Sequence, residues 1–363
     1  MTRRFWAPGR VNLIGDHTDY SGGLVLPAAI DHGLWLDVEA SAVIALESQL
    51  EQEAVTVAPD GSRPPATGWG RYVAAVAAEL AALGRPAVGL RGRLTGDLPT
   101  GSGLSSSAAL EVVVATALCA VADFALPPLE LAQAAQRAEE RAVGVPCGVM
   151  DQAASVLGRA DAAVLLHCGT LEHRLVAMPP ELAMVVLDSG VQRRLESSGY
   201  ATRRAELERG LVALQGRSPV AVATDELAGL VAAADLDEVA AARLHHVVTE
   251  NARVTAAAAA LERDPVDRTA LGELFAGSHA SLRDQYQVTV PETDLLVDLC
   301  LQTGAVAARM TGAGFGGAVV ALVDADRAAP VGDAVAAAYQ ARQDRWRATV
   351  VQCRAAEGAG ERG

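Results

Sequence analysis

The sequence contains no lysine. All 30 of its basic side chains are arginines, against 44 aspartates and glutamates. A Walker A phosphate loop needs a lysine and is therefore excluded, as is a lysine that forms a Schiff base or acts as a general base. Any phosphate chemistry must use arginine, backbone N–H groups or a metal ion. The formal net charge of −14 argues against general nucleic-acid binding, because it repels the phosphate backbone.

Cysteines are few, and their pattern fits neither a disulfide framework nor a zinc site. The five cysteines are widely spaced, their number is odd, and no Cys-x-x-Cys pair occurs. No apolar run reaches the roughly 18–20 residues that a membrane helix needs, and we expect no signal peptide at the start. These features predict a cytoplasmic protein that binds neither a membrane nor nucleic acid.

Aromatic residues make up only 4% of the chain, so alanine, valine and leucine must fill its core. The 363 residues exceed the roughly 250–300 that one compact core supports, which predicts two closely packed domains. Predicted strands and helices are clustered rather than strictly alternating, which indicates an α+β fold. The proline pair at 179–180 marks the boundary between domains 1–180 and 181–363. The small, polar tail 355–363 is expected to be disordered.

A glycine- and serine-rich segment at 101–109 lies between a predicted strand and a strongly apolar predicted helix. It reads Gly-Ser-Gly-Leu-Ser-Ser-Ser-Ala-Ala. Glycine lets the backbone approach an anion closely, and a helix start offers free N–H groups and the positive end of the helix dipole. This combination is typical of a phosphate site. On this segment alone, a serine-capped helix without a ligand is an equally good interpretation.

A second glycine-rich segment at 311–317, Thr-Gly-Ala-Gly-Phe-Gly-Gly, contains a Gly-x-Gly-x-x-Gly match. A dinucleotide fingerprint needs a strand before this pattern and a helix after it. Residues 318–323 are apolar and rich in valine, which predicts a strand instead. A bend that closes on a ligand or on another backbone therefore fits better than a dinucleotide site.

Two polar clusters follow apolar segments. Residues 16–20, Asp-His-Thr-Asp-Tyr, can hydrogen-bond the hydroxyls of a polyhydroxylated ligand. Asp151 lies among Val149, Met150 and alanines, which makes it a candidate buried carboxylate that acts as a base for a hydroxyl. Taken alone, each cluster is also explained without a ligand, the first as a hydrated turn and the second as an acidic residue at a helix start.

Together, these segments resemble the galactokinases and the wider superfamily that includes homoserine, mevalonate and phosphomevalonate kinases. Residues 9–20 are similar to the galactokinase signature, residues 98–111 to the second motif of the superfamily, and residues 309–317 to the third. Three motifs in this order are far more specific than any one of them. The resemblance implies a two-domain small-molecule kinase fold, ribosomal-S5-like at the N-terminus and ferredoxin-like at the C-terminus, with the active site between the domains.

The resemblance implies ATP-dependent phosphorylation of the anomeric hydroxyl of galactose to galactose 1-phosphate, with ATP and Mg2+ as cofactors. A kinase for N-acetylgalactosamine, L-arabinose or galacturonate and a non-catalytic sugar sensor are the alternatives. Asp151 would be the catalytic base, with Arg10 beside it. The implied sugar ligands are Asp16, His17, Asp19, Gly148 and Tyr200; the implied ATP ligands are Trp69, Gly101, Ser102, Gly103, Leu104, Ser105, Ser106 and Ser107; the implied Mg2+ ligands are Ser106, Ser107 and Glu139.

Two positions depart from the family pattern. Asp16 and Gly199 both stand where relatives usually carry glutamate. Both lie where the family holds its sugar, so they bear on the identity and anomer of the sugar more than on kinase activity. A nucleotide-dependent oxidoreductase built on residues 312–317 is the remaining alternative class. A monomer is expected, with a dimer as the open alternative.

Overall fold

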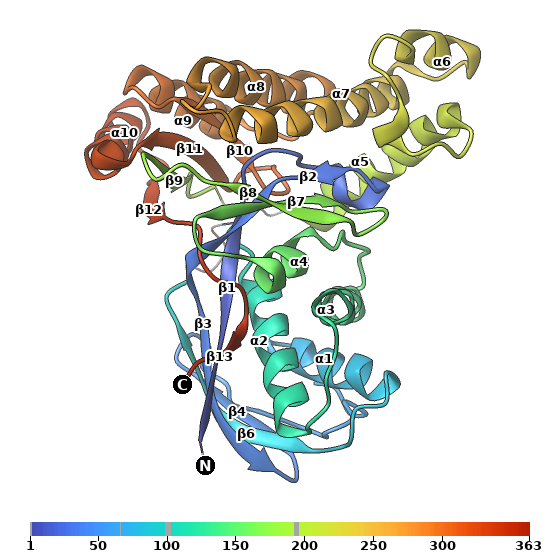
Figure 1. Cartoon of the computed structure of the whole chain (residues 1–363), viewed down its shortest axis with the longest axis vertical. Coiled ribbons are helices and arrows are strands. Elements are labelled where there is room, and N and C mark those ends of the chain that lie inside the picture. Colours follow the sequence, from blue (N-terminus) through green and yellow to red (C-terminus); the bar gives the residue numbers. More distant parts are fainter. Residues whose placement is uncertain (1, 66, 99–102, 192–195) are drawn as a thin grey trace.

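The structure, a computed structural model, describes residues 2–65, 67–98, 103–191 and 196–363. The molecule is elongated, with two lobes stacked along its long axis (Figure 1). Both chain ends lie on the left side of the lower lobe in this view, and the long helices of the C-terminal half lie across the top of the upper lobe.

The lower lobe is built on a six-stranded sheet with the strand order β13-β1-β3-β6-β4-β5. Neighbouring strands are antiparallel except for the parallel pair β4 and β6. In β3, Leu34, Leu36 and Val38 are buried while the residues between them are partly exposed, as the period of two in a strand requires. The strands are β1 Arg3–Asn12, β3 Pro27–Ser41, β4 Ile44–Ser48, β5 Val55–Val57, β6 Gly89–Gly96 and β13 Gly360–Glu361.

Four helices cover one face of this sheet. The second of them, α2, packs against β1 and β3 as well as against its neighbouring helices, which makes it the centre of the lobe. Its sequence is apolar on nearly every side, and Glu111 is its one charged residue. The helices are α1 Gly70–Ala82, α2 Ser106–Val121, α3 Pro128–Val143 and α4 Met150–Leu157.

The upper lobe contains a four-stranded antiparallel sheet with the order β10-β11-β9-β12. The strand predicted after the second glycine-rich segment is confirmed as β11, which is central and buried because its sequence is continuously apolar. The strands are β9 Leu182–Asp188, β10 Ala307–Thr311, β11 Ala318–Asp324 and β12 Thr349–Cys353. The helices are α5 Glu196–Leu211, α6 Leu227–Ala233, α7 Glu238–Leu261, α8 Arg268–Ser281, α9 Pro291–Gln302 and α10 Ala328–Arg342.

A three-stranded sheet with the order β2-β7-β8 lies between the two lobes (Figure 1). Its strands are β2 Leu24–Val25, β7 Ala162–His167 and β8 His173–Ala177. Short helical turns lie at η1 Asp19–Ser21, η2 Val212–Leu214, η3 Pro219–Ala221, η4 Leu282–Tyr286 and η5 Ala325–Arg327. The predicted division of the chain after residue 180 stays a prediction.

The tail 355–363 is ordered, so the expectation of disorder was wrong. The amide of Ala356 donates to the carbonyl of Ala29 at 2.9 Å, and the amide of Ala359 donates to the carbonyl of Ser155 at 2.8 Å. The tail then pairs with β1 as β13. Its small residues let the backbone approach the sheet and α4 closely. Backbone hydrogen bonds therefore hold the tail, which has few large apolar side chains to bury.

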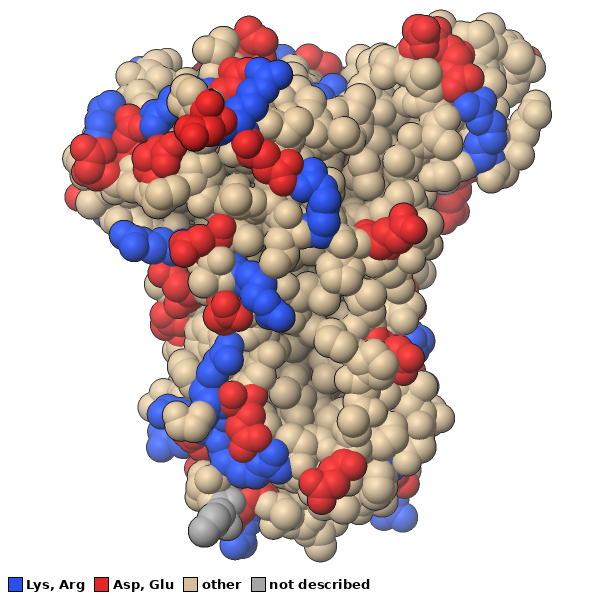
Figure 2. Space-filling view, viewed as in Figure 1, with Lys and Arg blue, Asp and Glu red and all other residues tan. Residues whose placement is uncertain are grey.

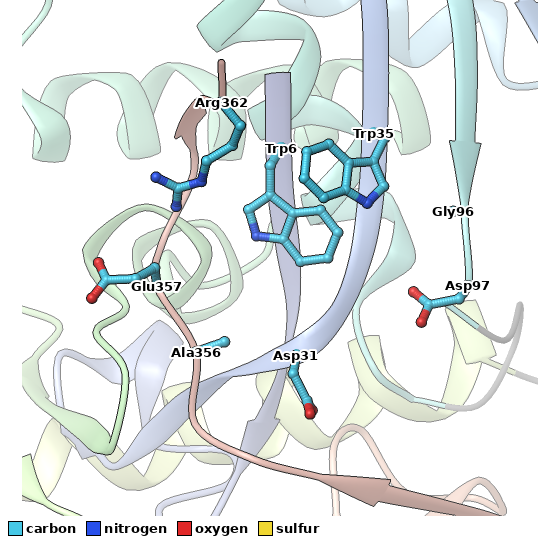
Figure 3. Close-up of a pocket in the computed structure, with 8 residues that line it drawn as sticks. All are labelled: Trp6, Asp31, Trp35, Gly96, Asp97, Ala356, Glu357 and Arg362. Carbon is cyan, nitrogen blue, oxygen red and sulfur yellow. The ribbon is translucent and has the colours of Figure 1, made fainter. Parts of the chain in front are cut away.

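A cavity of about 590 Å³ opens beside this tail, on the sheet face away from the helices (Figure 3). The rings of Trp6 and Trp35 meet there with a centroid distance of 4.7 Å. The nearby carboxylates already have partners in the chain, since Asp97 accepts from the amide of Gly33 and Glu357 accepts from the amide of Ala160. These polar groups fasten the tail and the strand ends to the sheet.

Charges of both signs are interspersed on the face seen in Figure 2. Ion pairs at the surface of the protein include Arg174 with Glu262 and Arg4 with Asp37. Within the described residues, no helix combines the length and the apolar character that crossing a membrane demands.

Candidate active site

A second cavity, also of about 590 Å³, lies between the two lobes. This volume is within the roughly 300–1,000 Å³ that small-molecule sites occupy. The lower lobe supplies the start of α2 and residues from β1, α3 and α4, and the upper part of the molecule supplies Tyr200 and the bend after β10. The lining residues are Arg10, Tyr72, Gly103, Ser105, Ser106, Ser107, Glu139, Val143, Val145, Pro146, Cys147, Asp151, Tyr200, Gly312, Ala313, Gly314 and Phe315.

Asp151, at the first turn of α4, is held by a bidentate ion pair with Arg10. The Arg10 Nε and Nη2 atoms each donate to one carboxylate oxygen at 2.8 Å. The hydroxyl of Ser105 also donates to Asp151. The Arg10 side chain is 6% exposed and that of Asp151 is 26% exposed, so the carboxylate faces the cavity while the guanidinium supports it from behind. The paired donors fix the direction in which the carboxylate points.

The turn that begins α2 is fastened to the same arginine. The Arg10 Nη1 atom donates to the carbonyl of Gly103 at 2.6 Å, and the Arg10 amide donates to the carbonyl of Leu104 at 3.1 Å. Gly103 and Ser105 have positive φ angles of 75° and 57°, which turn the chain sharply into the helix. The first N–H groups of α2 therefore lie beside Asp151, where the helix dipole favours an anion.

Glu139 of α3 forms the acidic wall of the cavity. One of its oxygens accepts from the Ser107 hydroxyl at 2.8 Å, and the other accepts from the amide of Gln152 at 2.7 Å. Burial, with the charge of Asp151 second, raises the pKa of Glu139. Glu111 also lies close, so Glu111, Glu139 and Asp151 share this region, where Arg10 pairs with Asp151. Clustered oxygen donors with excess negative charge suit a hard divalent cation such as Mg2+.

Asp19 and Gly148 are in contact with each other, and Asp19 senses the charge of Asp151. Neither is among the residues that line the cavity, so their role as sugar ligands stays a prediction. A Cβ atom on Gly148 would lie 1.8 Å from an oxygen of Asp19, so only glycine fits there. Burial, followed by the charge of Asp151, raises the pKa of Asp19 to about 7. Tyr200 completes this end, with its ring centroid 5.4 Å from that of Tyr20. Carboxyl and phenol groups of this kind can hydrogen-bond hydroxyls.

Comparison with known proteins shows which family this chain resembles in sequence and fold. The galactokinase galactose-binding signature matches residues 3–39, the GHMP kinases N terminal domain matches residues 71–159, and the GHMP kinases C terminal model matches residues 257–341. A crystal structure of Lactococcus lactis galactokinase complexed with galactose is 33% identical with a TM-score of 0.91, over 99% of this chain and 94% of that chain. The chain belongs to the galactokinase family.

More distant kinases share the fold of this galactokinase-family chain. Methanococcus jannaschii mevalonate kinase has a TM-score of 0.66 at 16% identity, covering 98% of each chain. Homoserine kinase from Cytophaga hutchinsonii has a TM-score of 0.65 at 18% identity, covering 99% of this chain and 97% of that chain. The α+β, two-domain small-molecule kinase fold expected from the three motifs is therefore confirmed.

Asp16 and His17 of the galactokinase signature contact other residues of the protein. One Asp16 oxygen accepts from the amide of Gly312 at 3.0 Å, and the other lies 2.5 Å from a guanidinium nitrogen of Arg309. Asp16 is 1% exposed, and His17 is 4% exposed. Neither residue is among those that line the cavity. The structure thus brings Asp16 to the glycine-rich bend, and its role as a sugar ligand stays a prediction.

The imidazole of His17 also has both nitrogens engaged. Nε2 lies 3.2 Å from the carbonyl oxygen of Ala313, and Nδ1 lies 3.0 Å from the hydroxyl of Tyr20. Burial lowers the pKa of His17 to about 3, so the ring is neutral near pH 7. A neutral ring with this geometry donates from Nε2 and accepts at Nδ1. His17 therefore holds the bend in place, and its role as a direct sugar ligand stays a prediction.

The structure does not bring Trp69 to the cavity. Trp69 is 6% exposed, belongs to the core of the lower lobe, and donates its indole N–H to the carbonyl of Glu53 at 2.8 Å. Tyr72, one turn along α1, lines the cavity instead. Stacking on adenine would need an exposed face of the indole ring, which the buried position of Trp69 does not favour. The role of Trp69 in binding ATP stays a prediction. Gly101 and Ser102 lie outside the described residues.

Sequence reasoning assigned no role to Glu111 or Gln152, although both adjoin the site. The signal for Glu111 was present, because a lone carboxylate in an apolar helix is costly to bury without a purpose. Gln152 directly follows Asp151 and gave no separate signal, since only the packing of three helices shows what its amide contacts.

Proposed function

We propose that this galactokinase-family protein transfers the terminal phosphoryl group of ATP to the anomeric hydroxyl of galactose, which yields galactose 1-phosphate and ADP. The observation that carries the proposal is that one arginine holds both the proposed base and the turn before α2. Arg10 bonds both Asp151 and Gly103, so the carboxylate and the start of α2 face one cavity. Phosphoryl transfer depends mainly on such positioning and on charge neutralisation.

In this mechanism Asp151 receives the proton of the sugar hydroxyl. The hydroxyl oxygen forms a bond to the terminal phosphorus of ATP as the bond from that phosphorus to the bridging oxygen breaks, and ADP leaves. Arg10 keeps the Asp151 carboxylate directed at the hydroxyl through its two hydrogen bonds. The arginine also offsets negative charge near the transferring group, where a protein without lysine relies on guanidinium groups, backbone N–H groups or a metal ion.

The start of α2 would hold the phosphates. Its free N–H groups and the turn at Gly103 and Leu104 provide donors for phosphate oxygens. Ser106, Ser107 and Glu139 line the cavity and would hold Mg2+, because a hard cation prefers oxygen ligands such as hydroxyls and carboxylates. When bound, the ion supplies positive charge that neutralises the phosphates.

Asp19, Gly148 and Tyr200 would hold the sugar. The carboxyl of Asp19 and the phenol of Tyr200 offer hydrogen bonds to hydroxyls, and Gly148 leaves room for the Asp19 carboxyl. The neighbouring carboxylates of Asp151 and Glu139 make the cavity acidic. This argues for a neutral sugar over galacturonate, whose carboxylate they would repel.

The test is ADP release with ATP, Mg2+ and a panel of sugars that contains galactose, N-acetylgalactosamine, L-arabinose and galacturonate. Galactose should give the highest kcat/KM. Turnover of another sugar without turnover of galactose would overturn the choice of substrate. Binding of ATP and sugar without any ADP release would instead favour a sugar sensor.

We further propose that one chain forms a complete site and acts as a monomer in the cytoplasm. The residues assigned to the base and to the metal line one cavity, and the cysteines at 119, 147, 168, 300 and 353 are all free. Light scattering during size-exclusion chromatography should give the mass of one chain, 37.4 kDa. Twice that mass under assay conditions would contradict the monomer.

A further inference from the structure

The side-chain amide of Gln152 joins three helices directly behind the acidic wall. Gln152 lies on α4, is fully buried, and has one nitrogen that contacts two carboxylates. That nitrogen donates to Glu111 of α2 at 2.9 Å and to Glu139 of α3 at 2.7 Å. An amide nitrogen has two hydrogens, so both are used.

This contact restricts the orientation of Glu139. One Glu139 oxygen accepts from Gln152 and the other accepts from Ser107, so its carboxylate is held at both ends. The Gln152 amide cannot be reversed without penalty, because its oxygen would then face two carboxylates. Glu139 is consequently fixed at the cavity wall before any ligand arrives.

Glu111 is the buried anchor of this arrangement. It is 0% exposed in an otherwise apolar helix, and its second oxygen has no hydrogen-bond partner among the described residues. A buried polar atom without a hydrogen-bond partner lowers the stability of the folded state. The packing of α2 does not require a carboxyl at this position, so the benefit of Glu111 lies in what it orients.

We propose that Gln152 and Glu111 are positioning residues that set the carboxylate of Glu139 for Mg2+ and thereby for the phosphates of ATP. The inference rests on the proposed kinase function, because it assigns Glu139 to the metal. Groups that hydrogen-bond a metal ligand fix its direction, and removing them lowers metal affinity or activity by about 10- to 100-fold.

The test uses the full chain and measures metal binding as well as activity. Gln152→Leu keeps approximately the size of the side chain and removes its hydrogen bonds. Binding of Mn2+ in the presence of ADP, followed by electron paramagnetic resonance, should weaken about 10- to 100-fold. In the kinase assay, the Mg2+ concentration that gives half-maximal rate should rise. The KM for galactose should change little, because Gln152 is buried and is not among the residues that line the cavity.

Two matched variants separate positioning from folding. Glu111→Gln keeps an oxygen that accepts from Gln152, so Mn2+ binding should remain within about threefold of the wild type. Gln136→Leu also removes a half-buried amide with two hydrogen bonds, to Glu140 and to the carbonyl of Cys147, and keeps the Cys147 thiol that donates to Glu139. It should leave Mn2+ affinity unchanged.

A double-mutant cycle decides whether Gln152 acts through Glu139. Glu139→Gln alone should weaken Mn2+ binding, and adding Gln152→Leu should weaken it no further. A folded Gln152→Leu protein with wild-type Mn2+ affinity would overturn the inference. Equal weakening in Gln136→Leu would also overturn it, since the effect would then be general to this region. Failure of the wild type to phosphorylate any sugar would overturn the proposed function instead.

Discussion

At the scale of single residues, Asp151 is the proposed catalytic base. Asp151→Asn retains the shape of the side chain and removes the charge and the proton acceptor. We expect kcat to fall by about 10²- to 10⁴-fold while ATP affinity is retained. Steady-state ADP release and equilibrium ATP binding measure the two quantities. Turnover close to that of the wild type would show that another group accepts the proton.

Asp19 gives the protein a pH dependence of known sign. Its folded pKa is about 7, against 3.8 for the ordinary group. The folded state thus holds this proton more tightly than the unfolded state, and the contribution of Asp19 to stability is lost as the pH rises from about 4 to about 7. Asp19→Asn removes the titration, so its melting temperature relative to the wild type should increase between pH 5 and pH 8.

Scanning fluorimetry at several pH values measures this difference. Asp225→Asn is the control, because Asp225 is an exposed carboxylate far from the cavity lining. Its melting temperature relative to the wild type should stay constant over the same range. A constant difference for Asp19→Asn as well would show that Asp19 is ionised across this range in both states.

At the scale of elements, the signature loop after β1 and the bend after β10 form one hydrogen-bonded unit. Arg309 of β10 is 0% exposed, donates to the carbonyl of Leu13 at 3.2 Å and pairs with Asp16. Thr311 donates to the carbonyl of Asn12 at 2.8 Å. The two lobes are therefore joined at the site through segments that are nearly 300 residues apart in the chain.

Removing the cation at this junction should be strongly destabilising. Arg309→Met removes a positive charge that lies beside the buried carboxylates of Asp16 and Glu250. We expect the free energy of unfolding to fall by about 3–5 kcal/mol, measured by urea denaturation. Arg217→Met removes an exposed pair with Glu226 and should change stability little. Equal losses in both variants would contradict the structural role of the buried arginine.

At the scale of the whole molecule, the tail connects the upper lobe to α4 and to the sheet of the lower lobe. Deleting residues 355–363 removes β13 and the hydrogen bonds to Ala29, Ser155 and Gly158. We expect a melting temperature lower by about 2–6 °C, because a loss of roughly 1–2 kcal/mol shifts a large domain by this amount. An unchanged melting temperature would show that the tail contributes nothing to stability.

The sequence was sufficient for the fold and for the segments that meet at the site. Motifs at 9–20, 98–111 and 309–317 carry local signals of turn and helix start, and the structure brings all three together. The sequence was not sufficient to predict side-chain contacts between elements that are far apart in the chain. The contacts of Asp16 and Gln152 depend on how separate elements dock, and the burial of Trp69 depends on its neighbours in the core.

The pairing of β13 with β1 places the two chain ends side by side. Phe5 lies opposite Glu361, the Arg362 amide donates to the carbonyl of Arg4, and Arg3 pairs with Glu361. Neighbouring strands are only about 4.8 Å apart, so a short linker suffices to join the end of β13 to the start of β1. A circular permutant with such a linker, reopened at the exposed residues 50–52 between β4 and β5, would keep the cleft between the lobes intact.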